Sequence, residues 1–241
     1  MEKVIHRSSD RGHANHGWLD THHTFSFANW YNPNQMHFGV LRVLNDDIVA
    51  PEKGFGQHPH ADMEIVSIPL RGALTHRDTM GNAQAITTGE VQVMSAGTGL
   101  QHSEFNESRE EEVNFLQLWI FPEKRGVEPR YEQKKFESEN RVNGWQQVVR
   151  PREEDGDGLW INQNAYMHLV DLESGKSSDY TVNSSGNGVY FFVIEGEVAI
   201  GDEQLNRRDG IGIWDVDSIS VSASKDSQIL AIEVPMELPN F

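Results

Sequence analysis

Short apolar runs separated by turn-forming residues extend through most of this chain and limit the folds that it can adopt. In the first half, such runs cover residues 38–44, 63–70, 91–94 and 113–121. Runs of this length, rich in β-branched and aromatic residues and bounded by Gly, Asn, Asp and Pro, are typical of β-strands. Long segments with the apolar period of an amphipathic helix are hard to find. The sequence therefore predicts an all-β fold of closed or sandwiched sheets, with few short helices, for example near residues 131–136.

A charged, turn-rich segment between residues 122 and 158 separates two strand-rich halves. Strand-like text resumes after it at residues 159–172, 189–200 and 211–214. A change of composition of this kind is typical of a domain connection, and 241 residues are enough for two domains. We therefore expect an N-terminal domain of residues 1–135 and a C-terminal domain of residues 136–241.

The two halves also resemble each other. Residues 68–72 (IPLRG) lead into a polar stretch and Gly89, and residues 193–196 (VIEG) lead into another polar stretch and Gly210. An internal repeat indicates duplication of one structural unit. We therefore expect two similar β-barrels.

The composition excludes several classes of protein. The chain is 37% hydrophobic and 9% aromatic, as in ordinary globular proteins. No run approaches the roughly 18 apolar residues of a membrane-spanning helix, and the first residues include no apolar secretory stretch, so we expect a cytoplasmic protein without a membrane partner. A net charge of −17 argues against nucleic acid, whose binding depends on Lys and Arg. Because cysteine is absent, any metal must be bound by imidazole and carboxylate groups.

Ten of the eleven histidines lie at or before position 102, so imidazole chemistry belongs to the first half. His58 and His60 are separated by one residue, just ahead of a predicted strand. On a strand, residues i and i+2 point to the same face, about 6.6 Å apart. A second pair with the same spacing, His102 and Glu104, follows a Gly-rich stretch. Presented on two antiparallel strands, the pairs predict a metal site of three imidazoles and one carboxylate.

This set of ligands restricts the metal. Three imidazoles and a carboxylate suit Fe(II), Mn, Co, Ni, Cu or Zn better than Ca or Mg, which prefer oxygen ligands. Surface exposure or packing explains any one of these histidines alone, but the two spaced pairs together favour a metal. Glu64 has the same parity as His58 and His60. With Glu104 available, we expect Glu64 to support the site by orienting a ligand imidazole, and direct binding of the metal by Glu64 is the alternative.

Several longer segments resemble the cupin motifs and, in detail, the pirin family. They are RGHANHGWLDTHHTFSFANWYNP, GFGQHPHADMEI, DTMGNAQAITTGEVQVMSAGTGLQHSE and PRYEQKKF. The resemblance covers nearly all of the first half and more faintly the second. It implies a bicupin with one metal site, formed by His58, His60, His102 and Glu104, with Fe(II) as the native metal. Because the segment VIEGEVAIGDEQLNRRDGIGIWD contains no His-x-His pair, we expect the second barrel to be free of metal.

The remaining candidates are assigned to simpler roles. The resemblance places His22 and His23 on a strand that borders the pocket, where a contact with substrate is the alternative to a structural role. We expect polar loop or packing roles for four other histidines, His13, His16, His37 and His76. Trp30 and Tyr31 are expected in the core or on an oligomer surface, before a role in stacking on substrate.

The function that the resemblance implies is that of a quercetin 2,3-dioxygenase, an oxidoreductase that opens a flavonol or other polyphenol with O2 and releases CO. A metal lowers the pKa of a bound hydroxyl group, and Glu104 is the expected catalytic residue, acting as both ligand and proton acceptor.

A non-enzymatic metal-binding sensor, acting through a regulatory protein partner, is the rival hypothesis. A deep cavity that ends at the metal site favours the enzyme, whereas an apolar surface patch beside the site favours the sensor. Sugar isomerase chemistry on a similar barrel is a further alternative. A purely structural bicupin is disfavoured, because such a protein requires no metal ligands.

Overall fold

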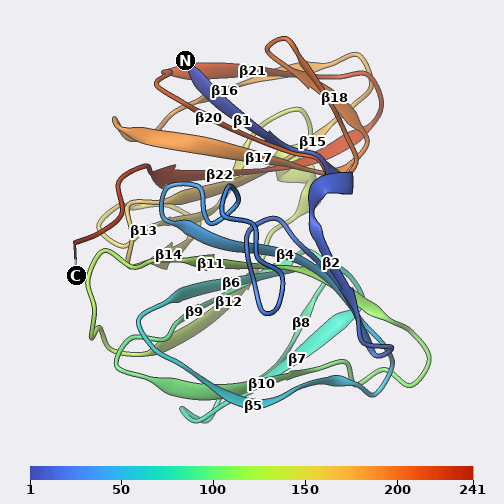
Figure 1. Ribbon diagram of the computed structural model, residues 1–241, viewed down its shortest axis with the longest axis vertical. Helices are drawn as coiled ribbons and strands as arrows, with labels where there is room; N and C mark the ends of the chain where they lie inside the picture. The colour runs from blue at the N-terminus through green and yellow to red at the C-terminus, as the bar shows by residue number, and fades with distance from the viewer. Residues whose placement is uncertain (241) are drawn as a thin grey trace.

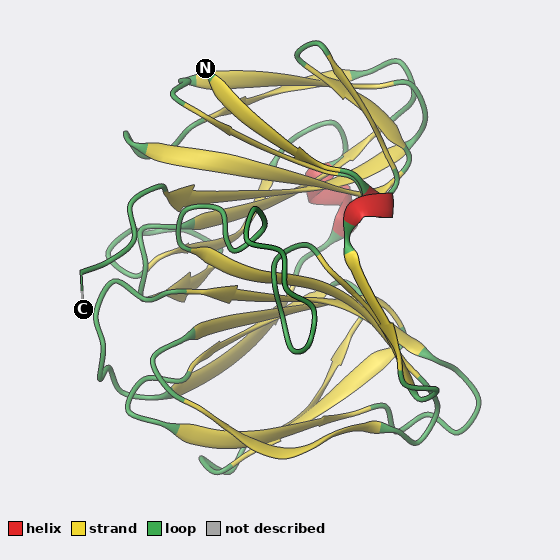
Figure 2. Ribbon diagram, viewed as in Figure 1, coloured by secondary structure: helices red, strands yellow, loops and turns green. Residues whose placement is uncertain are grey.

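The computed structural model describes residues 1–240, which form 22 strands and two short 3-10 helices. The helices are η1 (Ser8–Asp10) and η2 (Ser138–Arg141), and neither is long or apolar enough to cross a membrane. The predicted all-β class is therefore confirmed (Figure 2).

The first half of the chain forms two sheets (Figure 1). Its strands are β2 (Gly12–Asn15), β3 (Leu19–His23), β4 (Leu41–Val49), β5 (Gly54–His60), β6 (Glu64–Arg71), β7 (Ala73–Asp78), β8 (Ala83–Thr87), β9 (Glu90–Ser95), β10 (Leu100–Phe105), β11 (Val113–Ile120) and β12 (Arg130–Lys135). One sheet has seven strands in the order β12-β9-β6-β11-β4-β3-β2, and the other has four in the order β5-β10-β7-β8.

The second half repeats this arrangement. Its strands are β13 (Gln146–Pro151), β14 (Leu159–Ile161), β15 (Tyr166–Leu172), β16 (Ser177–Thr181), β17 (Asn187–Glu195), β18 (Glu197–Ile200), β19 (Glu203–Asn206), β20 (Gly210–Trp214), β21 (Ser218–Ala223) and β22 (Ser227–Pro235), joined by β1 (Glu2–His6) from the start of the chain. The seven-stranded sheet has the order β1-β20-β17-β22-β15-β13-β14, and the four-stranded sheet has the order β16-β21-β18-β19.

Strand orders in the two halves confirm the predicted repeat. Each strand from β4 to β11 has a counterpart eleven strands later in the corresponding sheet. Gly72 and Gly196 occupy equivalent turns, β6 to β7 and β17 to β18, and both have positive φ values of 78° and 92°. Glycine adopts this conformation without the steric cost that a Cβ atom adds. The apolar run 189–200 is thus two strands joined at Gly196.

Two expectations differ from the structure. The possible helix near residues 131–136 is wrong, because this segment is strand β12, whose residues pair with β9 from Arg130 opposite Ser95 to Lys135 opposite Glu90. A helix this short is marginal alone, whereas the sheet edge satisfies the backbone of the segment. The second difference concerns the division at residue 135. Strand β1 lies in the sheet of the second half, paired with β20, although its residues belong to the expected N-terminal domain.

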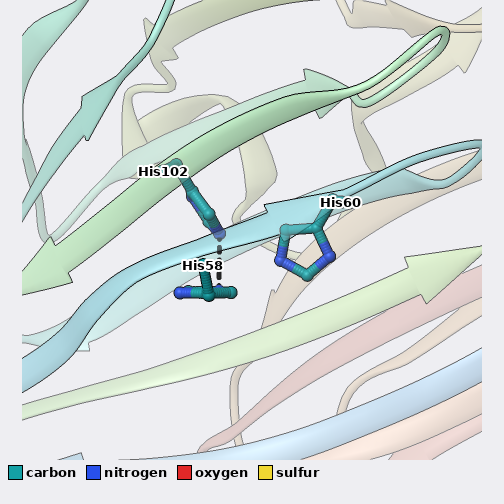
Figure 3. Close-up of side chains that lie close together, drawn as sticks. All are labelled: His58, His60 and His102. Atoms are coloured by element: carbon teal, nitrogen blue, oxygen red, sulfur yellow. Dashed lines mark hydrogen bonds between the residues drawn. The ribbon is translucent and has the colours of Figure 1, made fainter.

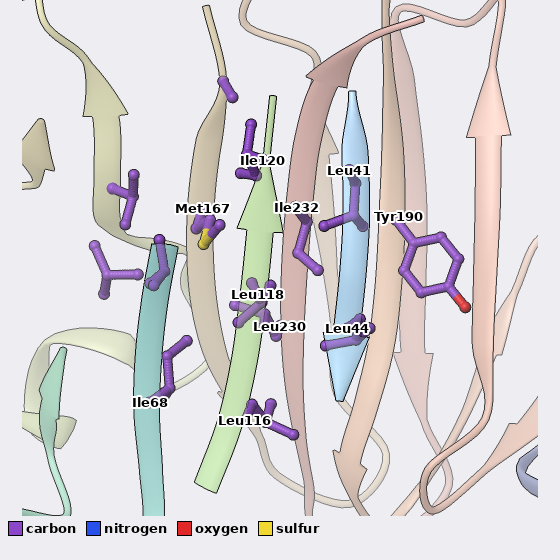
Figure 4. Packing of buried hydrophobic residues seen from close by; sticks show 14 of the residues in the cluster. Leu41, Leu44, Ile68, Leu116, Leu118, Ile120, Met167, Tyr190, Leu230 and Ile232 are labelled. Carbon is purple, nitrogen blue, oxygen red and sulfur yellow. The ribbon is translucent and has the colours of Figure 1, made fainter. Parts of the chain in front are cut away.

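The main hydrophobic core lies between the two seven-stranded sheets. Side chains of β11 and β22 alternate along the strands and meet there, as Figure 4 shows for Leu116, Leu118 and Ile120 of β11 and for Leu230 and Ile232 of β22. All five residues are at most 1% exposed. Burial of apolar surface on this scale holds the halves together as one body.

The interiors of the two halves differ in polarity. Sixteen buried apolar residues fill the space between the sheets of the second half. The first half encloses only two small apolar clusters, around Phe115 and around Met94, among its described residues. Buried polar groups occupy much of its remaining interior: His23, Asn45, Asp47, His76, His102 and Glu104. Polar groups are costly to bury unless they are hydrogen-bonded, so this interior points to a ligand site.

Substitution of Gly196 by Ala tests the turn that links β17 to β18. An added Cβ atom would lie 2.5 Å from the carbonyl oxygen of Asp226, in addition to the strain of the positive φ. Gly175 has a φ of 80° with nothing within 4 Å of the added atom, so Gly175→Ala is the matched control for backbone strain alone. In urea unfolding we expect the control to lose about 1–2 kcal/mol and Gly196→Ala to lose clearly more. Equal losses would contradict the packing role of this turn.

Candidate metal centre

Three imidazoles converge where β5 and β10 lie side by side. The strands are antiparallel neighbours, with His102 directly opposite His58 and Leu100 opposite His60. One nitrogen atom from each of His58, His60 and His102 lies within 4.8 Å of the other two (Figure 3). The predicted convergence of these three side chains is therefore what the structure contains.

Hydrogen bonds determine which nitrogens face the centre of this group. His58 donates its Nδ1–H to the carbonyl oxygen of Gly56 at 2.7 Å, which leaves Nε2 without a proton in the neutral ring. That Nε2 atom lies 3.0 Å from Nε2 of His102 (Figure 3). Two nitrogens can approach this closely when one carries a proton or when both bind one cation.

His76 determines which ring nitrogen of His102 carries the proton. Its Nε2 donates to Oδ2 of Asp78 at 2.9 Å, so its Nδ1 is an acceptor in the neutral ring. Nδ1 of His102 lies 3.3 Å from that acceptor and must supply the proton. The remaining nitrogen of His102, Nε2, is then unprotonated and faces His58. The series Asp78, His76, His102 thus presents a lone pair to the centre, as partners of metal-bound histidines do.

Burial keeps the imidazoles of His60 and His102 neutral. Desolvation, with a smaller contribution from His58, lowers the pKa of His60 to about 4. Desolvation and the neighbouring imidazoles lower the pKa of His102 to about 2. Neutral imidazole is the form that binds metal, so little proton release opposes binding at neutral pH. Three converging imidazole nitrogens, two of them 3.0 Å apart, fit a divalent transition metal.

Glu104 lies next to this group but not at its centre. The residue is only 1% exposed. Its carboxylate accepts hydrogen bonds from Nε2 of Gln117 at 2.8 Å and from Oγ of Ser67 at 3.4 Å. Burial raises its pKa to about 7, although both hydrogen bonds oppose the shift. An oxygen of Glu104 lies within 4.8 Å of nitrogens of His76 and His102. The fourth ligand position of Glu104 therefore stays a prediction.

A register shift positions Glu104. Between His102 and Glu104 the pairing of β10 with β5 slips, so that Glu104 is opposite Phe55. Such bulges bend a strand and redirect side chains near functional sites. Here the shift brings Phe55 and Glu104 into the lining of one cavity.

Glu64 does not support the site as predicted. Its carboxylate accepts hydrogen bonds from Oγ of Ser95 at 2.7 Å and from Nδ2 of Asn162, a residue of the second half, at 3.1 Å. It starts β6 on the face that carries Val66 and Ile68, which pack into the core between the halves. The parity of His58 and His60 does not extend to Glu64, because residues 61–63 separate the two strands. Glu64 is a structural group at the interface between the halves.

A cavity of about 520 Å³ opens onto the candidate metal centre. His58, His60, Glu104 and Gln117 contribute its polar lining on this side, and four aromatic side chains line other parts: Phe27, Trp30, Phe55 and Trp119. Trp30, expected in the core or on an oligomer surface, is thus part of the cavity wall. Tyr31 is 71% exposed.

The neighbouring histidines His22 and His23 point to opposite faces of β3, and only His23 lines the cavity. His23 is buried, lines the cavity, and approaches Oδ1 of Asn45 with Nδ1 at 2.9 Å. Asp47 also lines the cavity, and burial raises the pKa of its carboxyl group to about 7. On β3, His22 alternates with Thr21 and His23, which both line the cavity, and His22 itself does not line it.

Sequence reasoning missed His76, which was expected to be a packing or loop residue. Its side chain is completely buried, stacks on Tyr131 with ring centroids 4.5 Å apart, and links Asp78 to His102. The i, i+2 spacing of His76 and Asp78 was a usable signal, because it is the spacing of the two pairs that were recognised. Pairing of β7 with β10, which places Glu104 opposite His76, was not visible in the sequence.

The equivalent strands of the second half carry different residues. Strands β16 and β21, the counterparts of β5 and β10, read SSDYT and SISVSA and contain no histidine. The site in the first half therefore has no copy of its imidazoles at the equivalent place.

Known proteins resemble this chain over nearly its full length. Residues 4–120 match the family model described as Pirin, and residues 147–234 match the model described as quercetinase C-terminal cupin domain. Quercetin 2,3-dioxygenase of Escherichia coli strain K12 is 43% identical over 231 residues, which are 96% of this chain and 98% of that protein. A pirin-like protein of Caulobacter vibrioides is 38% identical over 92% of this chain and 95% of its own length.

A solved structure is similar to the same extent. The bacterial pirin YhhW of Escherichia coli, in complex with nickel(II), superposes with a TM-score of 0.91 at 42% identity. The match covers 97% of this chain and 99% of that protein. With the duplicated sheets and the histidine cluster, these similarities support a divalent metal site in this fold, and the chain belongs to the pirin family of bicupins.

Proposed function

We propose that this protein is a metal-dependent dioxygenase that opens flavonols such as quercetin with O2 and releases CO. The observation that carries the proposal is a cavity with aromatic walls that is lined by His58, His60 and the buried Glu104, beside the converging imidazole of His102. Its volume, about 520 Å³, lies in the range of about 300–1,000 Å³ found for small-molecule sites. Quercetin dioxygenase relatives at 43% identity support the same reaction.

The shape and chemistry of the lining suit a flat polyphenol. Trp119, Trp30 and Phe27 offer aromatic faces and edges, which bind planar rings well. Trp119 packs edge-on to both Phe27 and His60, with ring centroids 5.4 Å and 5.0 Å away. The aromatic wall is therefore continuous with the candidate metal centre, and a flat substrate on this wall would direct its polar edge to the imidazoles.

The protein would hold the metal through His58, His60 and His102, and we assign Glu104 as the fourth ligand. Fe(II) is the metal that we propose, with Zn, Mn, Co, Ni or Cu as the alternatives that this donor set permits. When bound, the metal would act as a Lewis acid that lowers the pKa of a substrate hydroxyl.

Glu104 is the residue that we assign to proton transfer. Its carboxylate faces the cavity and is held by Gln117 and Ser67, so it is positioned to accept the proton of a flavonol hydroxyl. A carboxylate with a pKa raised by burial is a better proton acceptor than an exposed one. The aromatic side chains of the lining would exclude water from beside the reacting groups once a flat substrate is bound.

The sensor hypothesis gains less support from the described residues. Five large hydrophobic side chains are exposed, and they come from separate segments: Met1, Tyr31, Met80, Val142 and Leu238. A protein partner usually binds a contiguous apolar patch, whereas a small molecule binds in a cavity. The cavity beside the imidazoles therefore favours the enzyme.

Replacement of His60 by Ala tests the metal site. We expect His60→Ala to lose the tightly held metal, because one of three converging nitrogens is removed. Elemental analysis after dialysis of untagged protein measures this, with His37→Ala as the control, since His37 is exposed and hydrogen-bonds only with the carbonyl oxygen of Gly39 among the described contacts. Retention of stoichiometric, dialysis-resistant metal in His60→Ala would remove the site.

Variants of His76 test the role of its Nδ1 atom. His76→Phe keeps a ring beside Tyr131 but removes the acceptor for Nδ1–H of His102, so we expect metal affinity to fall about 10- to 100-fold. His76→Asn offers an amide oxygen near the position of Nδ1 and should restore part of the affinity. Competition with a chromogenic chelator measures both. Equal affinity of His76→Phe and the unchanged protein would show that His102 needs no such partner.

An aerobic assay tests the reaction. Iron-loaded protein should consume quercetin, followed by loss of the flavonol absorbance and by release of CO. Glu104→Gln should lower kcat about 10²- to 10⁴-fold, the usual contribution of a general base. The metal content of this variant is measured in parallel, since a loss of metal identifies Glu104 as a ligand. If iron-loaded protein consumes quercetin no faster than metal-free protein, the dioxygenase proposal fails.

A further inference from the structure

A second group of metal-binding side chains lies on the hairpin of β2 and β3, away from the imidazoles of the first site. His13, Asp20 and His22 each offer a ligand atom, and these atoms lie within 4.8 Å of one another. Strand β2 is at the edge of the seven-stranded sheet (Figure 1).

Strand geometry in this group repeats that of the candidate metal centre. Asp20 and His22 are an i, i+2 pair on β3, and His13 of β2 is directly opposite His22. In the first site His58 and His60 are the i, i+2 pair, and His102 is directly opposite His58. In both cases two ligands on one strand and one on its antiparallel neighbour face the same side, which is the side-chain periodicity of a sheet.

The three side chains already point toward one another. The rings of His13 and His22 are stacked, with centroids 4.4 Å apart and planes inclined by 16°. Nε2 of His13 lies 2.7 Å from Oδ1 of Asp20, and Nδ1 of His22 lies 3.8 Å from the same oxygen. Asn15 donates from Nδ2 to the other oxygen of Asp20 at 3.3 Å and so orients the carboxylate. Both rings therefore present nitrogens on the edge where the carboxylate lies.

We propose that His13, Asp20 and His22 form a second site for a divalent transition metal such as Zn(II), Ni(II) or Cu(II). Two imidazoles and one carboxylate are the donors that these ions prefer. The side chains are 51%, 37% and 39% exposed in that order, so water completes the coordination and little desolvation opposes binding. Partial burial, with Arg11 and His13 nearby, lowers the pKa of His22 and favours its neutral form.

Of the three proposed ligands, His13 is the one that borders the cavity. It contributes to the cavity lining together with His16 and Ala14 of the same hairpin. A cation bound there would add positive charge beside the cavity of a protein whose formal charge is −17. Clefts with local charge attract ligands of opposite sign, so a bound cation would most strongly increase the association of anionic small molecules with the cavity.

Zinc titration of metal-free, untagged protein separates the two sites. His60→Ala removes the first site, and we expect this variant to bind about one equivalent of Zn(II) at the hairpin. The double variant His60→Ala, His13→Ala should lose that equivalent. His60→Ala, His16→Ala is the matched control, because His16 is an exposed histidine of the same hairpin outside the group, and it should bind like His60→Ala.

The results distinguish this proposal from the proposed function. Equal zinc binding by His60→Ala and by the double variant with His13→Ala overturns the second site, whatever the quercetin assay gives. Asp20→Asn in the His60→Ala background provides an independent variant and should weaken binding while leaving both rings in place. Circular dichroism checks that the variants keep the sheet signal. Loss of dioxygenase activity alone would leave the zinc difference unchanged.

Discussion

The polar interior of the first half is the constraint on which the rest of this structure depends. Histidines and carboxylates buried between two sheets are unfavourable unless each polar atom has a partner. His58 satisfies one nitrogen with the carbonyl oxygen of Gly56, and His102 satisfies one with His76. What remains is a set of lone pairs that face one another. Hydrogen bonding thus stabilises the buried polar groups and leaves nitrogen lone pairs that a divalent cation would bind.

Duplication explains how the chain remains stable with a polar interior in its first half. The second half has the same strand order but fills its interior with apolar side chains, and the two seven-stranded sheets bury a further core between them. Hydrophobic burial is the main favourable contribution to folding. One copy of the unit and the interface therefore supply stability, while the other copy holds polar groups that contribute little to it. The two copies therefore differ in the polarity of their interiors, although they share one strand order.

Much of this arrangement could be predicted from the sequence, and the remainder depended on long-range pairing. Strand content and the turns at Gly72 and Gly196 followed from local patterns, as did the shared faces of His58 with His60 and of His102 with Glu104. The prediction for Glu64 was wrong because residues 61–63 lie between two strands, so the alternation of side chains along β5 does not continue into β6. His76 was overlooked because its value comes from β7 lying beside β10. Local periodicity reveals which side a residue faces, but not which distant strand it meets.

Strand β1 pairs with a strand that lies far from it in the sequence. Residues 2–6 pair with residues 210–214, so one edge of the seven-stranded sheet of the second half is formed by a segment from the first half of the sequence. During synthesis, β1 cannot pair with β20 until residues 210–214 have been made. Contacts of such sequence separation are slow to form, and an open strand edge invites pairing with other chains. The synthesis of β20 thus determines when the edge of β20 that lies beside β1 is covered.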